Sequence, residues 1–276
     1  MKTFTTRRPL REYLSAQGNA TIGFVPTMGA LHNGHLSLIA QAKQDNDITV
    51  CSIFVNPTQF NDPKDLEKYP RPIEADMDKL EQAGCDVLFN PAVKEMYDDN
   101  EQWHLDIGQL EHLLEGEFRP GHYQGVMQIV YKLLDIVKPT SLYMGQKDYQ
   151  QFMVVSRMVE LMNIPVKMAM CPIEREADGL AMSSRNVHLT AQDRQHSLVL
   201  SKTLNWVKDN FSIGDIVKLQ QQALEKLAAE GGVEPEYFRI VDGQTLLPAT
   251  ESTQNVVALT AVRVGKTRLI DNVLIR

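Results

Sequence analysis

The sequence predicts an α/β protein, in which a doubly wound parallel sheet is followed by a smaller α+β domain. Short apolar runs alternate with segments of helical periodicity between Thr21 and Met170, which is typical of strand–helix–strand units. Residues 48–55 (ITVCSIFV) are almost entirely apolar, as in a central strand of a parallel sheet that is covered on both faces. The alternation ends near Arg185, where two helical segments and three strand-like runs predict a separate α+β unit.

The first part of the chain supplies the elements of a Rossmann-like sheet. Pro26 is expected to end the first strand, and Gly84 to stop the second helix. Leu36, Ile39 and Ala40 are expected to share one apolar face of the first helix. In such sheets ligands bind beyond the carboxyl ends of the strands, so the loops there are candidate sites. We expect strands at residues 21–25, 48–55, 86–89, 141–144 and 166–170, and helices at residues 34–43, 73–83, 123–137 and 149–162.

The second part of the chain has a different pattern. Gly231 and Gly232 break the chain after its helices, and Gly265 with Lys266 marks a tight turn between the last two strands. We therefore divide the chain into domains at residues 1–175 and 176–276. The expected helices span residues 191–210 and 213–230, and the expected strands span residues 237–241, 256–262 and 267–274.

Composition and charge exclude several classes of protein. With 276 residues, 43% hydrophobic and 23% charged, the chain is an ordinary globular sequence. Its net charge of −7 argues against a general nucleic-acid binder. The 3 cysteines form no CxxC pair, so neither a disulfide framework nor a zinc knuckle is expected. We see no signal peptide and no apolar run long enough to span a membrane, so we expect a cytoplasmic protein.

The strongest motif is PTMGALHNGH, which occupies residues 26–35 between the first expected strand and the first expected helix. The N-terminus of a helix offers unpaired N–H groups and partial positive charge, so it attracts phosphate. Gly29 and Gly34 would let the backbone approach a ligand closely. His32 and His35 are three residues apart, so on a helical turn they point to the same side. Two imidazoles there could stabilise the charge that develops on phosphate oxygens during group transfer.

Three other interpretations of this segment stay open at this point. The HxxH spacing could bind zinc, although no cysteine or carboxylate lies nearby in the sequence as a third ligand. Gly29 and Gly34 have the GxxxxG spacing of a P-loop, but its Lys and Ser/Thr positions are His35 and Leu36. The two histidines could also form a purely structural pair.

Two more motifs suit phosphate oxygens. MSSRN, at residues 182–186, offers two hydroxyls and the guanidinium of Arg185, although such a string alone is usually a solvated turn. GQKDYQQ, at residues 145–151, follows the fourth expected strand. Lys147 could reach a phosphate there as a point charge, and Asp148 could cap the next helix. The structural alternative for this motif is the helix cap with a solvated lysine.

Two loops at strand ends carry other polar side chains. Asn56 and Gln59 in FVNPTQF have amides that suit a hydroxy-acid substrate, although a plain loop would also use Asn-Pro. Arg119 in FRPGHY is either a ligand for an anion or a solvated loop residue. GKT at residues 265–267 lacks the upstream glycine of a Walker A motif and is predicted to be a hairpin turn. The sequence has no GxSxG elbow, so nucleophilic hydrolysis has no support.

The HxGH form directly after the first strand resembles the nucleotidyltransferase superfamily. All these motifs in this order, with YPRP at residues 69–72 and READGLAMSSRN at residues 175–186, resemble the pantothenate synthetase (pantoate–β-alanine ligase) family. The resemblance implies that ATP drives the condensation of pantoate with β-alanine through a pantoyl-adenylate, giving pantothenate, AMP and pyrophosphate. It also implies a nucleotide- and pantoate-binding domain, a small C-terminal domain that closes over the ATP site, a homodimer and Mg²⁺.

The resemblance also gives roles to individual residues. His35 falls on the proton-donor position of the family, and we expect His32, Lys147 and Arg185 to act with it as catalytic residues. Gln59 and Gln151 fall on the positions that hold pantoate, and Gln59 also touches β-alanine. The expected ATP-binding residues are Met28, Gly29, Ala30, Leu31, His32, Asn33, Gly34, His35, Gly145, Gln146, Lys147, Asp148, Glu174, Met182, Ser183, Ser184 and Arg185; the expected substrate-binding residues are Pro26, Thr27, Asn56, Gln59, Arg119 and Gln151.

This chain departs from the family pattern at two places. Glu174 stands where family members usually have valine, and only a backbone contact with ATP would survive that change. The carboxylates after YPRP are shifted and are here Glu74, Asp76 and Asp78. We therefore assign no protein ligand to Mg²⁺, which is expected to bind mainly through phosphates.

Three other functions are alternatives to the ligase. A small-molecule nucleotidylyltransferase of the same superfamily fits the HxGH motif equally well and is the nearest alternative. A small aminoacyl-tRNA synthetase is disfavoured because the chain is acidic and has no room for an anticodon-binding domain. A nucleotide sensor without catalysis is disfavoured by the presence of both histidines, Lys147 and Arg185. The expected partners are small molecules, with no nucleic acid and no membrane.

Overall fold

The computed structural model of the chain describes residues 1–99 and 101–276, which form two compact units. The division after Pro172 lies close to the boundary that we expected after residue 175, but a short segment that follows β5 packs with the second unit. The first unit contains Met1–Gly145 and Gln150–Pro172, and the second contains Gln146–Tyr149 and Ile173–Arg276.

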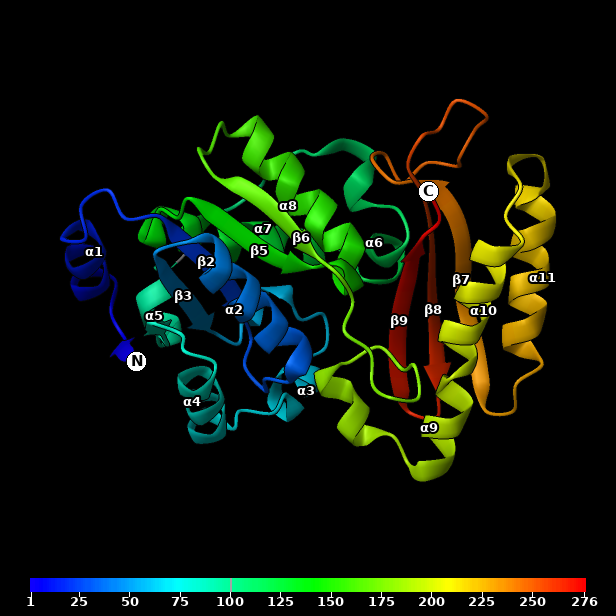
Figure 1. Ribbon diagram of the computed structural model, residues 1–276, viewed down its shortest axis with the longest axis horizontal. Coiled ribbons are helices and arrows are strands. Elements are labelled where there is room, and N and C mark those ends of the chain that lie inside the picture. The colour runs from blue at the N-terminus through cyan, green and yellow to red at the C-terminus, as the bar shows by residue number, and fades with distance from the viewer. Residues whose placement is uncertain (100) are drawn as a thin grey trace. The chain divides into compact units, whose positions relative to one another are not determined.

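Six parallel strands form the sheet of the first unit, in the order β1-β4-β3-β2-β5-β6, of which Figure 1 labels β2, β3, β5 and β6. The chain proceeds outward from β2 to β3 and β4 on one side and from β5 to β6 on the other, so the order reverses between β2 and β5. The predicted doubly wound sheet is thus confirmed, and ligands in such sheets bind beyond the carboxyl ends of the strands at the reversal. The strands are β1 (Lys2–Phe4), β2 (Ile22–Thr27), β3 (Ile48–Ile53), β4 (Val87–Phe89), β5 (Ser141–Gly145) and β6 (Lys167–Cys171).

Helices cover both faces of this sheet, because alternate strand residues enter two different apolar cores. Phe24 and Val50 pack in the core that contains α1, α7 and α8, whereas Val25 and Cys51 pack in the core that contains α2 and α4. The helices of this unit are α1 (Arg7–Ser15), α2 (Asn33–Asp45), α3 (Pro63–Lys68), α4 (Ile73–Gln82), α5 (Val93–Met96), α6 (Glu115–Phe118), α7 (His122–Val137) and α8 (Tyr149–Leu161), with short 3₁₀ turns η1 (Pro57–Gln59) and η2 (Gly108–Glu111).

Two details of the first unit differ from expectation. Pro26 does not end its strand: it lies within β2 and pairs in register with Ser52. The Thr27 carbonyl accepts from the Phe54 N–H, so the backbone polar groups of Thr27 face β3 and those of Pro26 face β5. The pairing of β2 with β5 ends at Phe24, so no hydrogen bond of the sheet is lost because proline has no N–H. The expected apolar face of α2 was wrong at Ala40, which is exposed because the buried face runs through Leu38, Ile39 and Ala42.

An antiparallel sheet of three strands, β7-β8-β9, forms the centre of the second unit (Figure 1). Gly265 and Lys266 make the expected two-residue hairpin, with Gly265 at a φ of 55°. The long helix expected at residues 191–210 is two helices that meet at Leu198. The elements are η3 (Gln146–Asp148), η4 (Ser184–His188), α9 (Ala191–Ser197), α10 (Val199–Asp209), η5 (Ile213–Asp215), α11 (Ile216–Ala228), β7 (Val233–Asp242), β8 (Val256–Val264) and β9 (Thr267–Leu274).

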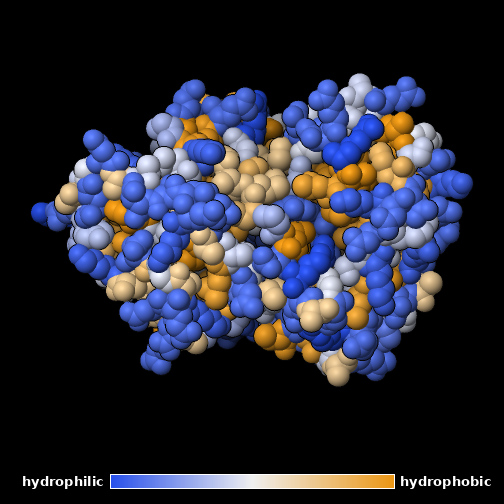
Figure 2. All heavy atoms as spheres, viewed as in Figure 1, coloured by the Kyte–Doolittle hydropathy of each residue, from blue (hydrophilic) through white to orange (hydrophobic). Residues whose placement is uncertain are grey.

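The surface is predominantly hydrophilic on the face shown in Figure 2, with apolar side chains in small groups. Exposed apolar side chains such as Val187 and Val217 are ordinary on a globular protein when they are scattered. Within residues 1–99 and 101–276, no helix has the length and apolar character that crossing a membrane requires.

Candidate active site

The PTMGALHNGH segment forms the end of β2, a tight loop and the first turn of α2. Thr27 begins the loop, and its hydroxyl donates to the Ser52 carbonyl at 2.7 Å and accepts from the Gly29 N–H at 3.2 Å. Gly29 and Ala30 then have φ values of 79° and 51°, which turn the backbone sharply toward the helix. For an alanine this conformation costs about 1–2 kcal/mol, so another part of the protein must stabilise it.

Helix α4 provides that stabilisation. Asp76 is fully buried, and its two carboxylate oxygens accept from the N–H groups of Ala30 and Leu31, each at 2.7 Å. Lys79, one turn further along α4, donates to the Leu31 carbonyl at 2.6 Å. A side chain at Gly29 would have its Cβ 2.9 Å from Asp76 Oδ2, so this loop position also needs glycine. The sequence does not indicate this role of Asp76, because no local pattern connects it with a loop 45 residues away.

The backbone of this loop gives the first testable prediction. Asp76→Asn should lower the free energy of unfolding by about 1–3 kcal/mol, because an amide can accept from only one of the two buried N–H groups. Urea denaturation followed by fluorescence measures the change. Asp78→Asn is the matched control, since Asp78 is exposed on the same helix. Equal unfolding midpoints for the two variants would contradict this role of Asp76.

The two histidines lie together at the N-terminus of α2, as their spacing predicts. His32 is the N-cap residue, and its ring centroid lies 4.1 Å from that of His35. His35 Nδ1 accepts from the His32 backbone N–H at 3.3 Å. Because Nδ1 is the acceptor, the neutral ring of His35 carries its proton on Nε2 and can donate from there. The site therefore offers an imidazole donor at the positive end of a 13-residue helix.

The 3₁₀ turn η1 places a buried amide against this loop. Gln59 is 8% exposed, and its Nε2 donates to Met28 Sδ at 3.0 Å. A thioether is a weak acceptor, so this donor could form a stronger bond with a carboxylate or hydroxyl oxygen of a ligand. Gln59 Oε1 accepts from Asn56 Nδ2 at 3.1 Å, which orients the amide.

Asn56 itself is 1% exposed, and both polar atoms of its side chain form hydrogen bonds within the protein. Its Nδ2 also donates to the Gly125 carbonyl at 3.0 Å, and its Oδ1 accepts from the Tyr97 hydroxyl at 2.6 Å. Burial raises the pKa of Tyr97 to about 12, so this hydroxyl remains a donor. Gly125 lets α7 approach η1 closely, because a Cβ there would lie 2.4 Å from the Thr58 carbonyl oxygen.

Arg119 lies beside the same turn. It donates to His122 Nε2 at 3.2 Å, and His122 Nδ1 in turn donates to the Gln59 carbonyl at 2.8 Å. Because a guanidinium cannot accept a hydrogen bond, these two bonds determine that Nδ1 of His122 carries the proton. Arg119 and Gln59 are thus brought together in space although 60 residues separate them in sequence.

The two adjacent glutamines of α8 have different environments. Gln150 is 3% exposed, and its amide donates to the carbonyls of Leu110 and Leu113 and accepts from the Glu115 N–H. Gln151 is half-buried and has no side-chain hydrogen bond within residues 1–99 and 101–276. Of the two, Gln150 has a structural role and Gln151 retains its amide for a ligand.

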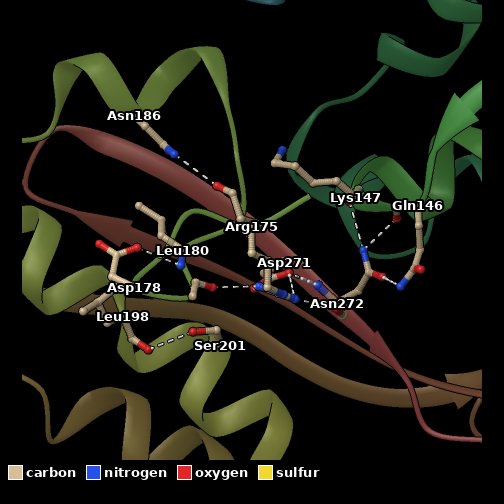
Figure 3. Close-up of polar contacts among 12 residues, drawn as sticks. Gln146, Lys147, Arg175, Asp178, Leu180, Asn186, Leu198, Ser201, Asp271 and Asn272 are labelled. Carbon is tan, nitrogen blue, oxygen red and sulfur yellow. Dashed lines mark hydrogen bonds and ion pairs between the residues drawn. The ribbon is translucent and has the colours of Figure 1, made fainter. Parts of the chain in front are cut away.

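In the second unit, Gln146–Asp148 form the turn η3 directly after β5. The Lys147 side chain is 18% exposed, and its Nζ lies 3.9 Å from Asp148 Oδ1. The Asn272 side chain on β9 donates to the backbone carbonyls of Gln146 and Lys147 at 2.9 and 3.0 Å (Figure 3). These bonds hold the segment with the second unit.

The segment that carries MSSRN is a closed loop in the same unit. The Glu174 carbonyl accepts from the Met182 N–H at 2.9 Å, while the Glu174 side chain is exposed, so its backbone performs the structural role here. Asn186 Nδ2 donates to the Ala181 carbonyl at 3.1 Å and to Glu176 Oε1 at 2.9 Å. Hydrogen bonding to Arg194 lowers the pKa of Glu176, so this carboxylate stays charged. The loop presents the hydroxyls of Ser183 and Ser184 and the exposed guanidinium of Arg185.

The doubly wound sheet and the HxGH histidines at the N-terminus of α2 define a protein of the nucleotidyltransferase superfamily. A profile of the family described as pantoate-beta-alanine ligase matches residues 2–274. The chain therefore belongs to the pantoate–β-alanine ligase family.

Relatives and solved structures agree with this placement over the whole chain. A pantothenate synthetase of Acetivibrio thermocellus is 43% identical and covers 100% of this chain and 99% of the relative. A crystal structure of pantothenate synthetase from Thermus thermophilus has a TM-score of 0.93 at 40% identity and covers 100% of this chain and 99% of that one. The ligase from Francisella tularensis, described as complexed with β-γ ATP and β-alanine, has a TM-score of 0.83 at 36% identity and covers 99% and 97%.

Proposed function

We propose that this protein catalyses the ATP-dependent condensation of pantoate with β-alanine, giving pantothenate, AMP and pyrophosphate. The observation that carries the proposal is the contact between Gln59 Nε2 and Met28 Sδ at 3.0 Å. It puts an amide suited to an organic acid directly against the loop suited to phosphate, within one unit. A carboxylate held there would lie close to a bound nucleotide, as adenylation of the acid requires. The alternative, a nucleotidylyltransferase acting on a phosphate ester, is not favoured by family membership.

We propose roles for the site residues on the same basis. Gln59 and Gln151 would bind pantoate by hydrogen bonds, and Arg119 would attract its carboxylate. Asn56 would act through Gln59, because its own polar atoms are already engaged. We retain Pro26 and Thr27 on the substrate side; on the ATP side we retain Met28, Gly29, Ala30, Leu31, His32, Asn33, Gly34, His35, Gly145, Gln146, Lys147, Asp148, Glu174, Met182, Ser183, Ser184 and Arg185.

The proposed reaction has two steps. A pantoate carboxylate oxygen bonds to the α-phosphorus of ATP, and the bond from that phosphorus to pyrophosphate breaks. The amine of β-alanine then bonds to the acyl carbon, the bond to the AMP oxygen breaks, and the amine loses a proton. The protein holds the reactants close together and limits hydrolysis of the adenylate.

The activated acid is proposed to be bound without a covalent link to the protein. Cys51, Cys85 and Cys171 are all buried. Burial raises the pKa of Cys85 and Cys171 to about 11 and also raises that of Cys51, so none is a ready thiolate nucleophile. His35 Nε2 and the amine of Lys147 instead supply hydrogen bonds and positive charge to the phosphates.

We propose no protein ligand for Mg²⁺ in the described part of the chain. No cluster of three or more metal-ligating side chains occurs there, and both oxygens of Asp76 accept backbone N–H groups. We propose that Mg²⁺ enters with ATP, bound to its phosphates. The homodimer that the family resemblance implies and the cytoplasmic location that we expect from the sequence both stay predictions.

Isotope exchange between pyrophosphate and ATP tests the proposed function. The exchange should require pantoate and should proceed without β-alanine, because pyrophosphate leaves before the amine reacts. Radiolabelled pyrophosphate and purified protein suffice, with pantothenate formation measured after β-alanine is added. Exchange that appears only with β-alanine present would contradict the two-step route, and product formation from another acid but not pantoate would contradict the assignment.

A further inference from the structure

Two adjacent residues of β9, Asp271 and Asn272, connect two segments that lie far apart in the sequence. They are 3% and 1% exposed. Successive side chains of a strand point to opposite faces, so neighbouring residues can hold different partners. Figure 3 shows both residues between the loop that starts at Arg175 and the turn that carries Gln146 and Lys147.

Asn272 uses its side-chain amide entirely on the turn η3. Its two N–H bonds go to the carbonyls of Gln146 and Lys147, at 2.9 and 3.0 Å, and its Oδ1 accepts from Gln146 Nε2 at 3.0 Å. These bonds fix the peptide groups on both sides of the Lys147 Cα. The Lys147 side chain extends away from the Asn272 amide (Figure 3), so the amide sets its direction without contacting its amine.

Asp271 holds the other segment through Arg175. The guanidinium donates to Asp271 Oδ2 at 2.7 Å and to Oδ1 at 3.0 Å, and also to the Gly179 carbonyl at 3.1 Å. Arg175 and Ala181 pair as an isolated antiparallel bridge, which closes the loop just before Met182. Asp271 is therefore connected through one guanidinium to the start of the segment that carries Ser183 and Arg185.

The stability of the fold alone does not account for this arrangement. Removing a carboxylate such as Asp271 from water is costly, and a buried ion pair is often no more stable than well-packed apolar residues. The same two positions hold both of the segments in the second unit that were assigned to phosphate. Residues that determine the geometry of these two segments must themselves be rigid, and fully hydrogen-bonded side chains are rigid.

We propose that Asp271 and Asn272 are positioning residues for adenylation. They hold the turn η3 and the Ser183–Arg185 loop in the conformation that binds the ATP phosphates. The inference rests on the proposed function of Lys147 and Arg185. Neither residue touches substrate; each acts through the segment that it holds.

The test compares Asn272→Asp with Lys147→Met in both half-reactions. Asn272→Asp keeps the shape of the side chain but replaces both N–H donors with an oxygen that faces two carbonyls. Pantoate-dependent pyrophosphate–ATP exchange should fall on the order of 10–100-fold, the scale of a small misplacement of a catalytic group. The reaction of pre-formed pantoyl-adenylate with β-alanine should stay within about threefold. Val207→Ala is the control, because it removes buried apolar volume from the core of the same unit, on helix α10, which carries neither segment.

A double variant separates positioning from general damage. If Asn272 acts through Lys147, Asn272→Asp should cost less than about threefold when Lys147 is already methionine, because coupled residues are not additive. A full, additive loss in that background, an equal loss in both half-reactions, or the same loss in Val207→Ala would overturn the inference.

Direct titration with ATP keeps this test independent of the proposed reaction. Asn272→Asp and Lys147→Met should weaken ATP binding by similar factors of about tenfold, the scale of one hydrogen bond to a charged group. If the parent protein binds ATP but shows no pantoate-dependent exchange, the proposed function is wrong. The ATP affinities of the two variants then still test the positioning role of Asn272. The positioning role would be overturned if Lys147→Met binds ATP more weakly than the parent protein while Asn272→Asp binds it with unchanged affinity.

Discussion

Replacing His35 with alanine should lower kcat on the order of 10²–10³, the scale of one lost preorganised donor. The His35 ring can donate from Nε2, since its Nδ1 accepts from the His32 N–H at 3.3 Å. A donor at the N-terminus of α2 is worth most when charge builds up on the transferring phosphate, so ATP affinity should change far less than kcat. Steady-state kinetics at saturating pantoate and β-alanine, with a separate ATP titration, measures both quantities.

Two amide variants distinguish donation from loop structure. In His35→Gln the side-chain amide nitrogen reaches about as far as Nε2, whereas in His35→Asn it can replace only Nδ1. If Nε2 donation matters, His35→Gln should retain more activity than His35→Asn. The reverse order would assign His35 to holding the His32 backbone. His112→Ala is the control, because His112 is an exposed histidine of the same unit and should keep the parent kcat.

The fold was largely predictable because the signals for it are local. Apolar runs located five of the six strands of the first sheet, and glycine located the hairpin between β8 and β9. The edge strand β1 was missed, because Lys2–Phe4 is short and exposes its first two residues. The end of the first helix of the second unit at Leu198 was also missed, since neither glycine nor proline marks it.

The site was predictable only where its residues are consecutive. HxGH lies on one helical turn, so spacing alone brings His32 and His35 together. Asp76 contacts Leu31 from 45 residues away, and Asn272 contacts Lys147 from 125 residues away. No sequence period connects such pairs, because tertiary packing alone determines them. Their shared signal is a polar residue amid apolar neighbours, as in RLIDN at residues 268–272, which predicts burial with a partner but does not identify the partner.

Lys147→Met should divide the two half-reactions. The methionine side chain has a similar length and no charge, so the change removes one positive charge from the triphosphate while leaving the backbone bonds of η3 to Asn272 possible. Adenylate formation should fall on the order of 10²–10³, since the charge that it stabilises develops as pyrophosphate leaves. Pre-formed pantoyl-adenylate should react with β-alanine within about threefold of the parent rate, because that pyrophosphate has already departed.

Single-turnover experiments make this division measurable. Rapid mixing of protein with ATP and pantoate reports pyrophosphate release, and mixing with synthetic pantoyl-adenylate and β-alanine reports the second step. Lys266→Ala is the matched control, because Lys266 is exposed in the GKT hairpin and should leave both steps unchanged. Equal losses in the two steps would mean that Lys147 holds the AMP portion that both steps share. A loss confined to the second step would place its charge at the amine reaction, and the assignment of Lys147 to the triphosphate would then be wrong.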